Sequence, residues 1–163
     1  MLPCGSIQAD MNSIVSGFTT RNGMALHRKT IHTAAELNEV IGPVIERMNA
    51  AEYPDSDVLA MRLALEEAIV NAIKHGHQGD PKKAVRVRYQ VTARQVLAEV
   101  RDQGPGFDPN QVPDPTAPEN LERATGRGLF LMRHFTTWVR FNRRGNCVTL
   151  CLARSGKAKQ RFN

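Results

Sequence analysis

The sequence predicts an α+β fold in which helices pack on one face of a mixed, mostly antiparallel β-sheet. Three observations favour this class. Two pairs of alternating, valine-containing segments, residues 83–90 with 95–101 and 138–142 with 147–153, have the pattern of β-hairpins. Residues 57–75 carry apolar side chains at helical spacing. The predicted order is strand, helix, helix, strand, strand, long loop, helix, strand, strand, which is typical of an α+β sandwich.

The length and composition indicate a single folded domain. The chain has 163 residues, of which 41% are hydrophobic, 6% aromatic and 23% charged. At about 150 residues a compact chain buries roughly two thirds of its unfolded surface, so the core needs neither disulfides nor a metal. We expect residues 1–24, which are polar and aperiodic, to be a flexible leader. Residues 25–154 are expected to fold, and residues 155–163 to form a basic tail.

Several features favour a cytoplasmic location. No apolar run approaches the ~20 residues needed to cross a bilayer, and residues 1–10 lack the basic and apolar regions of a secretory signal. The three cysteines, Cys4, Cys147 and Cys151, form no CxxC pair. We therefore expect reduced structural thiols and no membrane association.

The charge balance favours acidic or polyanionic partners. Lys and Arg outnumber Asp and Glu by 22 to 16, which gives a net charge of +6. No nucleic-acid recognition motif accompanies this charge, and aromatic residues are few. Direct nucleic-acid binding, which would use the basic tail, therefore ranks last among the functions considered.

The first predicted elements are a strand and a helix. Residues 26–31 alternate loosely, as an edge strand does. Thr33, followed three residues later by Glu36, has the spacing of a helix N-cap, and the helix should run to about residue 51. Pro43 falls inside this helix and is expected to kink or interrupt it, because proline has no N–H to donate.

The next helix, residues 57–75, is expected to be capped by Asp55 or Ser56. One apolar stripe along it must face the sheet. This stripe consists of Val58, Met61, Leu65, Ala68, Ile69 and Ala72.

After the first hairpin, residues 104–125 form a long loop rich in glycine and proline, and loops of this length are usually functional. Residues 128–135 then form a helix before the second hairpin.

A polar cluster lies opposite the apolar stripe of the helix at residues 57–75. Glu67, Asn71 and Lys74 share one face because they are spaced at i, i+4 and i+7. The amide oxygen of Asn71 can ligate Mg²⁺. The carboxylate of Glu67 can accept a proton from an attacking hydroxyl group, and Lys74 can neutralise phosphate charge. The alternative is a solvated helix face with a Glu–Lys pair.

Two glycine-rich segments also have the character of a ligand site. Asp102-Gln-Gly104-Pro-Gly106 follows a strand, so its carboxylate can accept a hydrogen bond from a base while the glycines let the backbone approach a ligand. Gly126-Arg127-Gly128 precedes a helix, where backbone N–H groups and an arginine can bind phosphate. The alternatives are an ordinary turn and an ordinary glycine-rich helix start.

Together and in this order, the three segments resemble the N, G1 and G2 boxes of the GHKL ATPase superfamily, which includes histidine kinases, Hsp90, gyrase B and MutL. Within it, the sequence is most similar to the anti-sigma-factor serine/threonine kinases of bacterial stress and sporulation switches. That similarity rests on Leu63-Ala-Leu-Glu-Glu-Ala-Ile-Val-Asn-Ala-Ile-Lys-His-Gly76 and Gly126-Arg-Gly-Leu-Phe-Leu-Met-Arg133. The resemblance implies a Bergerat-type two-layer α/β sandwich that binds ATP and Mg²⁺ under a lid at residues 107–125.

The resemblance also implies roles for individual residues. Glu67 would be the catalytic base and Asn71 the Mg²⁺ ligand, while Asp102 would bind the adenine amine. Lys74 and His75 would approach the nucleotide, although His75 could instead be a histidine stabilised by the helix C-terminus. The glycine segments supply the rest: Gly104 and Gly106 would shape the pocket, and Gly126, Arg127 and Gly128 would surround the phosphates.

The resemblance finally implies an ATP-dependent serine/threonine protein kinase that acts as an anti-sigma factor. Such a protein phosphorylates a serine of an anti-sigma-factor antagonist, sequesters a sigma factor and is often a homodimer. The alternative is an ATP-gated protein-binding module that transfers no phosphate.

Overall fold

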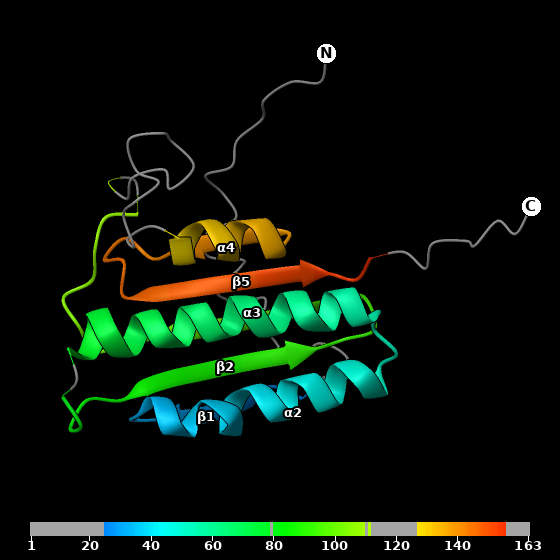
Figure 1. Ribbon diagram of the computed structural model, residues 1–163, viewed down its shortest axis with the longest axis horizontal. Coiled ribbons are helices and arrows are strands. Elements are labelled where there is room, and N and C mark those ends of the chain that lie inside the picture. Colours follow the sequence, from blue (N-terminus) through cyan, green and yellow to red (C-terminus); the bar gives the residue numbers. More distant parts are fainter. Residues whose placement is uncertain (1–24, 79, 110, 112–126, 156–163) are drawn as a thin grey trace, which may run out of the picture.

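The computed structural model describes residues 25–78, 80–109, 111 and 127–155 (Figure 1). The predictions for the leader, for Gly126, for the tail beyond residue 155 and for most of the lid concern residues outside this part of the chain. None of the helices in these described ranges has both the length and the apolar content of a membrane-spanning segment.

Within the described ranges, five strands form one open sheet. They are β1 (His27–Ile31), β2 (Val85–Val91), β3 (Gln95–Arg101), β4 (Trp138–Phe141) and β5 (Cys147–Ala153). Their order is β1-β2-β3-β5-β4, and each neighbouring pair is antiparallel. Both predicted hairpins, the predicted edge strand β1 and the antiparallel pairing are present. A mixed sheet would also contain a parallel pair of strands, and none occurs among these five strands.

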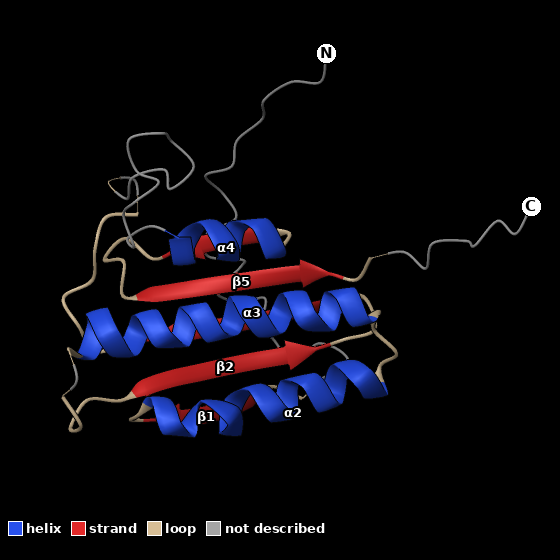
Figure 2. Ribbon diagram, viewed as in Figure 1, coloured by secondary structure: helices blue, strands red, loops and turns tan. Residues whose placement is uncertain are grey.

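Three α-helices cover one face of this sheet: α2 (Leu37–Ala50), α3 (Asp55–Asn71) and α4 (Arg127–Phe135) (Figure 2). The core lies between the helices and the sheet, so the predicted two-layer α+β sandwich is confirmed. Met61, Leu65 and Ile69 of the predicted stripe are fully buried, while Val58 packs only at the edge of the core. Apolar spacing along α3 therefore determines which of its faces meets the sheet.

The start of α2 differs in detail from the prediction. A 3₁₀ turn, η2 (Ala34–Glu36), precedes α2, and Thr33 occupies its N-cap position without capping a backbone N–H. The Thr33 hydroxyl instead donates to Oε1 of Glu36 at 2.8 Å, and Oε2 of Glu36 accepts the backbone N–H of His32 at 3.2 Å. Helix α2 continues through Pro43 rather than ending there. The single hydrogen bond that proline removes is evidently outweighed by the buried contacts of residues on either side.

Both ends of α3 also differ from the prediction. Pro54 occupies the N-cap position, and neither Asp55 nor Ser56 caps the helix with its side chain. Asp57 is buried instead, and its carboxylate accepts hydrogen bonds from the backbone N–H and the hydroxyl of Ser155, both at 2.8 Å. At its C-terminal end α3 passes into a π-helical turn, η3 (Ala72–His77), which ends at Gln78 with φ of +54°. Such wide turns are uncommon and often occur at functional sites.

Candidate functional site

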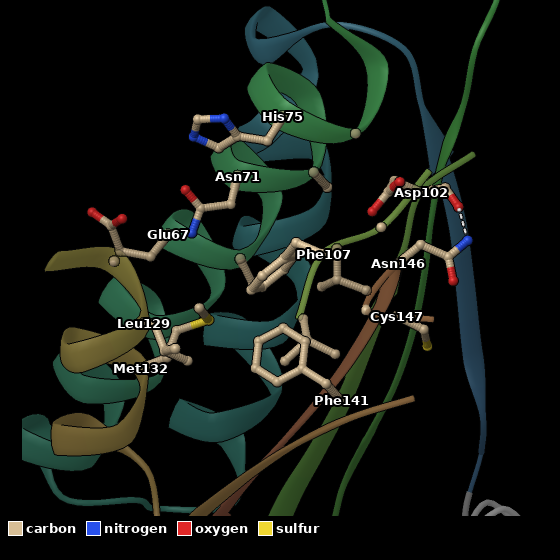
Figure 3. Close-up of a pocket in the computed structure, with 18 of the residues that line it drawn as sticks. Glu67, Asn71, His75, Asp102, Phe107, Leu129, Met132, Phe141, Asn146 and Cys147 are labelled. Atoms are coloured by element: carbon tan, nitrogen blue, oxygen red, sulfur yellow. Dashed lines mark hydrogen bonds between the residues drawn. The ribbon is translucent and has the colours of Figure 1, made fainter. Parts of the chain in front are cut away.

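A pocket of about 670 Å³ lies between α3, the start of α4 and one end of the sheet (Figure 3). The apolar part of its wall includes Val100, Leu129, Met132, Phe141 and Val148. Polar side chains border the pocket in two groups, one on α3 and α4 and one after β3. Proteins bind small ligands in clefts of about 300–1,000 Å³ with mostly apolar walls and a few convergent polar groups. The volume and lining therefore suit a ligand with both an apolar and a polar part.

Glu67, Asn71 and His75 form the first polar group and project from the same side of α3 and η3 (Figure 3). They are one helical turn apart, because four residues bring a side chain back to nearly the same direction. Glu67 and Asn71 are half-buried, whereas His75 and the nearby Lys74 are exposed. These four residues therefore all border the pocket, two of them half-buried and two exposed.

Helix α4 begins directly against this pair. A methyl group at Gly128 would lie 2.7 Å from Oε2 of Glu67 and 2.8 Å from Nδ2 of Asn71, so a larger residue cannot fit without displacing them. Arg127 and Gly128 both line the pocket. The first N–H groups of a helix have no partner within it, and the helix dipole makes this end electropositive. The start of α4 is therefore suited to bind an anionic group such as phosphate.

The second polar group is centred on Asp102, directly after β3. Oδ1 of Asp102 accepts the backbone N–H of Gly104 at 2.6 Å. A methyl group at Gly76 would lie 2.7 Å from Cβ of Asp102, and one at Gly104 would lie 2.6 Å from Cα of Gly76. The turn η3, Asp102 and Gly104 therefore pack with no side chain between them. This packing fixes the distance between the end of α3 and the acid.

The connection after Asp102 also touches the turn between β4 and β5. Gly106 has φ of +81° and Gly145 has φ of +76°, a conformation that side chains disfavour. A methyl group on Gly106 would overlap the carbonyl oxygen of Arg144, and one on Gly145 would overlap that of Phe107. The Phe107 ring meets the Phe141 ring edge-on, with centroids 5.3 Å apart. The two loops thus form one wall of the pocket.

The structure brings most of the predicted site residues to this pocket. Those that line it are Glu67, Asn71, Lys74, His75, Asp102, Gly106, Arg127 and Gly128. Gly104 does not line the pocket and lies behind Asp102, where its N–H and its lack of a side chain support the acid. Gly126 lies outside the described residues. The chemical roles assigned to these residues stay predictions.

Sequence reasoning placed Phe107 in the lid and missed several other pocket residues, among them Phe141, Asn146 and Cys147. The β3–β5 register pairs Arg101 with Cys147, which places Asn146 opposite Asp102. A correct pairing of the predicted strands would have found this relation, because neighbours across an antiparallel pair follow from the register. Burial raises the pKa of the Cys147 thiol to about 11, with a smaller contribution from the charge of Glu99. Cys147 is therefore a neutral wall residue near pH 7 and a poor nucleophile.

The residues that line the pocket fit Mg²⁺ bound together with a nucleotide better than a metal ion held by protein side chains alone. Among the described residues, no three His, Cys, Asp or Glu side chains are grouped to hold a metal ion. Mg²⁺ in nucleotide sites is commonly held by one or two protein oxygens, with phosphates and water completing its shell. Asn71, half-buried beside Glu67, can supply such an oxygen.

This combination defines a class of protein. Helices on one face of an antiparallel sheet, with an acid after a central strand and an amide–carboxylate pair on a helix at the same pocket, are the architecture of the GHKL ATPases and their Bergerat-type fold. A family model described as "Histidine kinase-like ATPase domain" matches residues 32–152. The chain belongs to this family.

Comparison with curated proteins identifies relatives among bacterial regulators. The chain is 31% identical over 86 residues to the serine/threonine-protein kinase BtrW of Bordetella bronchiseptica, a match that covers 52% of this chain and 61% of that protein. It is 30% identical over 94 residues to the serine-protein kinase RsbW of Bacillus licheniformis, covering 54% and 59%. It is 30% identical over 82 residues to the anti-sigma F factor of Shouchella clausii, covering 48% and 56%. The chain thus spans between 56% and 61% of the length of these relatives.

Proposed function

We propose that the chain is an ATP-dependent serine/threonine protein kinase that acts as an anti-sigma factor. It would phosphorylate a serine of an antagonist protein and would bind a sigma factor. One observation carries the kinase proposal: Glu67 and Asn71 lie one turn apart against the start of α4, at the same pocket as Asp102. The proposed proton acceptor, metal ligand and anion site would thereby lie next to one another.

The pocket has distinct ends for the two parts of ATP. The base would lie toward Asp102, whose carboxylate would accept a hydrogen bond from the exocyclic amine, while the apolar wall packs on the ring. The phosphates would lie toward the start of α4, where backbone N–H groups, Arg127 and Lys74 oppose their charge. Mg²⁺, held in part by Asn71, would neutralise phosphate charge.

Glu67 would act on the acceptor serine. Its carboxylate would take the proton of the hydroxyl group as the serine oxygen bonds to the γ-phosphorus. The bond between that phosphorus and the bridging oxygen breaks, and ADP leaves with the electron pair. Phosphoryl transfer depends mainly on positioning and charge neutralisation, so this small set of residues is sufficient.

The proposed partners follow from the relatives. Proteins named serine-protein kinase and anti-sigma F factor each match about half of this chain at about 30% identity. The name anti-sigma F factor supports a sigma factor as a partner. The antagonist protein and the homodimer are proposed on the family resemblance alone. The balance of 22 basic to 16 acidic residues also favours acidic protein partners.

The test compares two neighbouring glutamates. Glu67→Gln keeps the shape of the side chain but removes the proton acceptor, so it should bind ATP normally and lose at least about 100-fold in transfer rate. Glu66→Gln is the matched control, because Glu66 is the adjacent residue on α3 and does not line the pocket. ATP affinity is measured by calorimetry, and transfer by label on serine after incubation with γ-labelled ATP and candidate antagonist proteins.

Each outcome has a defined meaning. Normal transfer by the Glu67→Gln variant would refute the assignment of the base. ATP binding by the unmodified chain with no label on any antagonist would refute the kinase proposal and favour an ATP-gated binding module.

A further inference from the structure

Two asparagines in the turn between β4 and β5 connect this turn to the proposed base-binding acid. Asn142 lies just after β4 and Asn146 just before β5, and both are half-buried. Asn146 lines the pocket next to Asp102 (Figure 3). We propose that Asn142 and Asn146 are positioning residues that orient Asp102 and so determine how strongly the pocket prefers a purine with an exocyclic amine. This inference rests on the proposed function.

The orientation of the Asn142 amide is set by the backbone. Its Oδ1 accepts the N–H of Asn146 at 3.1 Å and the N–H of Cys147 at 3.2 Å. Both donors are backbone groups, so this position of the amide must hold the oxygen rather than the nitrogen. The Nδ2 of Asn142 therefore points to the other side, where it donates to Oδ1 of Asn146 at 2.9 Å.

The Asn142 side chain in turn fixes the orientation of the Asn146 amide. Its Oδ1 faces the donor on Asn142, so its Nδ2 must face away, and it donates to the carbonyl oxygen of Asp102 at 3.2 Å (Figure 3). The backbone N–H of Asp102 donates to the carbonyl oxygen of Asn146 at 3.0 Å. Both backbone polar groups of Asp102 are thus bonded to one residue.

The side-chain amide of Asn146 takes the place of one backbone hydrogen bond of the sheet. Asp102 lies one residue beyond the last β3–β5 pair, Arg101 with Cys147. The backbone N–H of Asn146 is occupied by Asn142, so the side-chain amide of Asn146 bonds the Asp102 carbonyl in its place. The peptide group that follows Asp102 is held in one orientation, and Gly104 can then donate to Oδ1 of Asp102. The direction of the carboxylate therefore depends on Asn146.

The test uses two nucleotides that differ in one group. ATP carries the exocyclic amine, and purine riboside triphosphate carries a hydrogen atom in its place. The unmodified chain should bind ATP about 10- to 100-fold more tightly, the range expected for one hydrogen bond to a charged acceptor. In Asn146→Ala this preference should fall to about threefold or less, while affinity for purine riboside triphosphate changes by no more than about twofold. A merely structural role would weaken both nucleotides equally and leave their ratio unchanged.

A second variant guards against misfolding of the first. Asn142→Asp keeps an oxygen to accept the two backbone N–H groups but loses the Nδ2 donor, so the Asn146 amide should turn its nitrogen toward residue 142 and its oxygen toward Asp102. The preference for ATP should again fall to about threefold or less, whereas Arg143→Ala, at an exposed residue of the same turn, should leave it unchanged. Circular dichroism establishes that each variant is folded.

The outcomes separate this inference from the proposed function. If the unmodified chain prefers ATP and the folded Asn146→Ala and Asn142→Asp variants keep its ratio, the inference is wrong and the proposed nucleotide site stands. If the unmodified chain binds neither nucleotide, the proposed function fails, and the inference fails with it.

Discussion

Replacing Gly128 by alanine should impair the function of the pocket without lowering the stability of the fold. The added methyl group would lie 2.7 Å from Oε2 of Glu67 and 2.8 Å from Nδ2 of Asn71. Both atoms are at the ends of flexible side chains, so the fold can accommodate the methyl group by moving them. Alanine is also a better helix former than glycine by up to about 1 kcal/mol, although the gain is smaller in the first turn. The thermal midpoint should therefore stay the same or rise.

The effect on function should be large and in the opposite direction. To reach an ordinary contact distance, the Glu67 carboxylate must move by about 0.7 Å, and the Asn71 amide by a similar amount, which is on the scale at which misplacement costs about 100-fold in rate. We expect Mg-ATP affinity to fall about tenfold and transfer to fall about 100-fold, because Asn71 and Glu67 are displaced together.

Calorimetry with Mg-ATP, thermal unfolding and the transfer assay measure these effects. Gly42→Ala is the control, because a methyl group at Gly42 in α2 meets no atom within 4 Å and Gly42 does not line the pocket. A Gly128→Ala protein with normal affinity and normal transfer would refute the placement of phosphate and metal between α4 and the Glu67–Asn71 pair. A marked loss of thermal stability would refute the argument that only flexible side chains are displaced.

Four further predictions concern stability and the reactivity of the buried thiols. Asp57→Ala should lower the free energy of unfolding by about 2–4 kcal/mol in urea titrations, because two hydrogen bonds from Ser155 to a buried carboxylate are lost; an unchanged midpoint would contradict this. Burial raises the pKa of Cys147 and of Cys151 to about 11, so both thiols should resist iodoacetamide at neutral pH until the chain is unfolded. Because these values exceed the ordinary value of 9.0, stability should fall as pH rises from there toward 11, and a flat profile would argue against buried thiols. His77→Leu should leave stability unchanged or raise it by about 1 kcal/mol in thermal unfolding, since the ring is 1% exposed and neither nitrogen has a hydrogen-bond partner in the described structure; a clear loss would indicate a partner.

Apolar spacing made the helix layer and the polar face of α3 predictable. Met61, Leu65 and Ile69 recur at helical intervals, and burying them leaves Glu67 and Asn71 on another side of the helix, where they lie against the start of α4. The hairpins were predictable for the same reason, since alternation along β2 and β3 places one set of side chains in the core.

The pocket wall formed by the loop after Asp102 and the turn between β4 and β5 depends on contacts between segments that are distant in the sequence. Asn146 reaches Asp102 only because β3 and β5 pair in a particular register, and no local pattern around residue 146 specifies that partner. The π-helical turn η3 at the end of α3 likewise involves a distant segment. It contains Gly76, which packs on Asp102. Pro43 was expected to disturb α2, but buried neighbours on both sides override its local preference.

The two hydrogen bonds from Ser155 to the Asp57 carboxylate have a practical use. They fasten the last described residue to the first turn of α3, whereas the pocket lies beside the last turns of that helix, about 20 Å away along its axis. An affinity tag, fluorophore or surface linker attached beyond Ser155 therefore starts from the end of α3 remote from the pocket, which suits it for immobilising the chain in nucleotide-binding measurements.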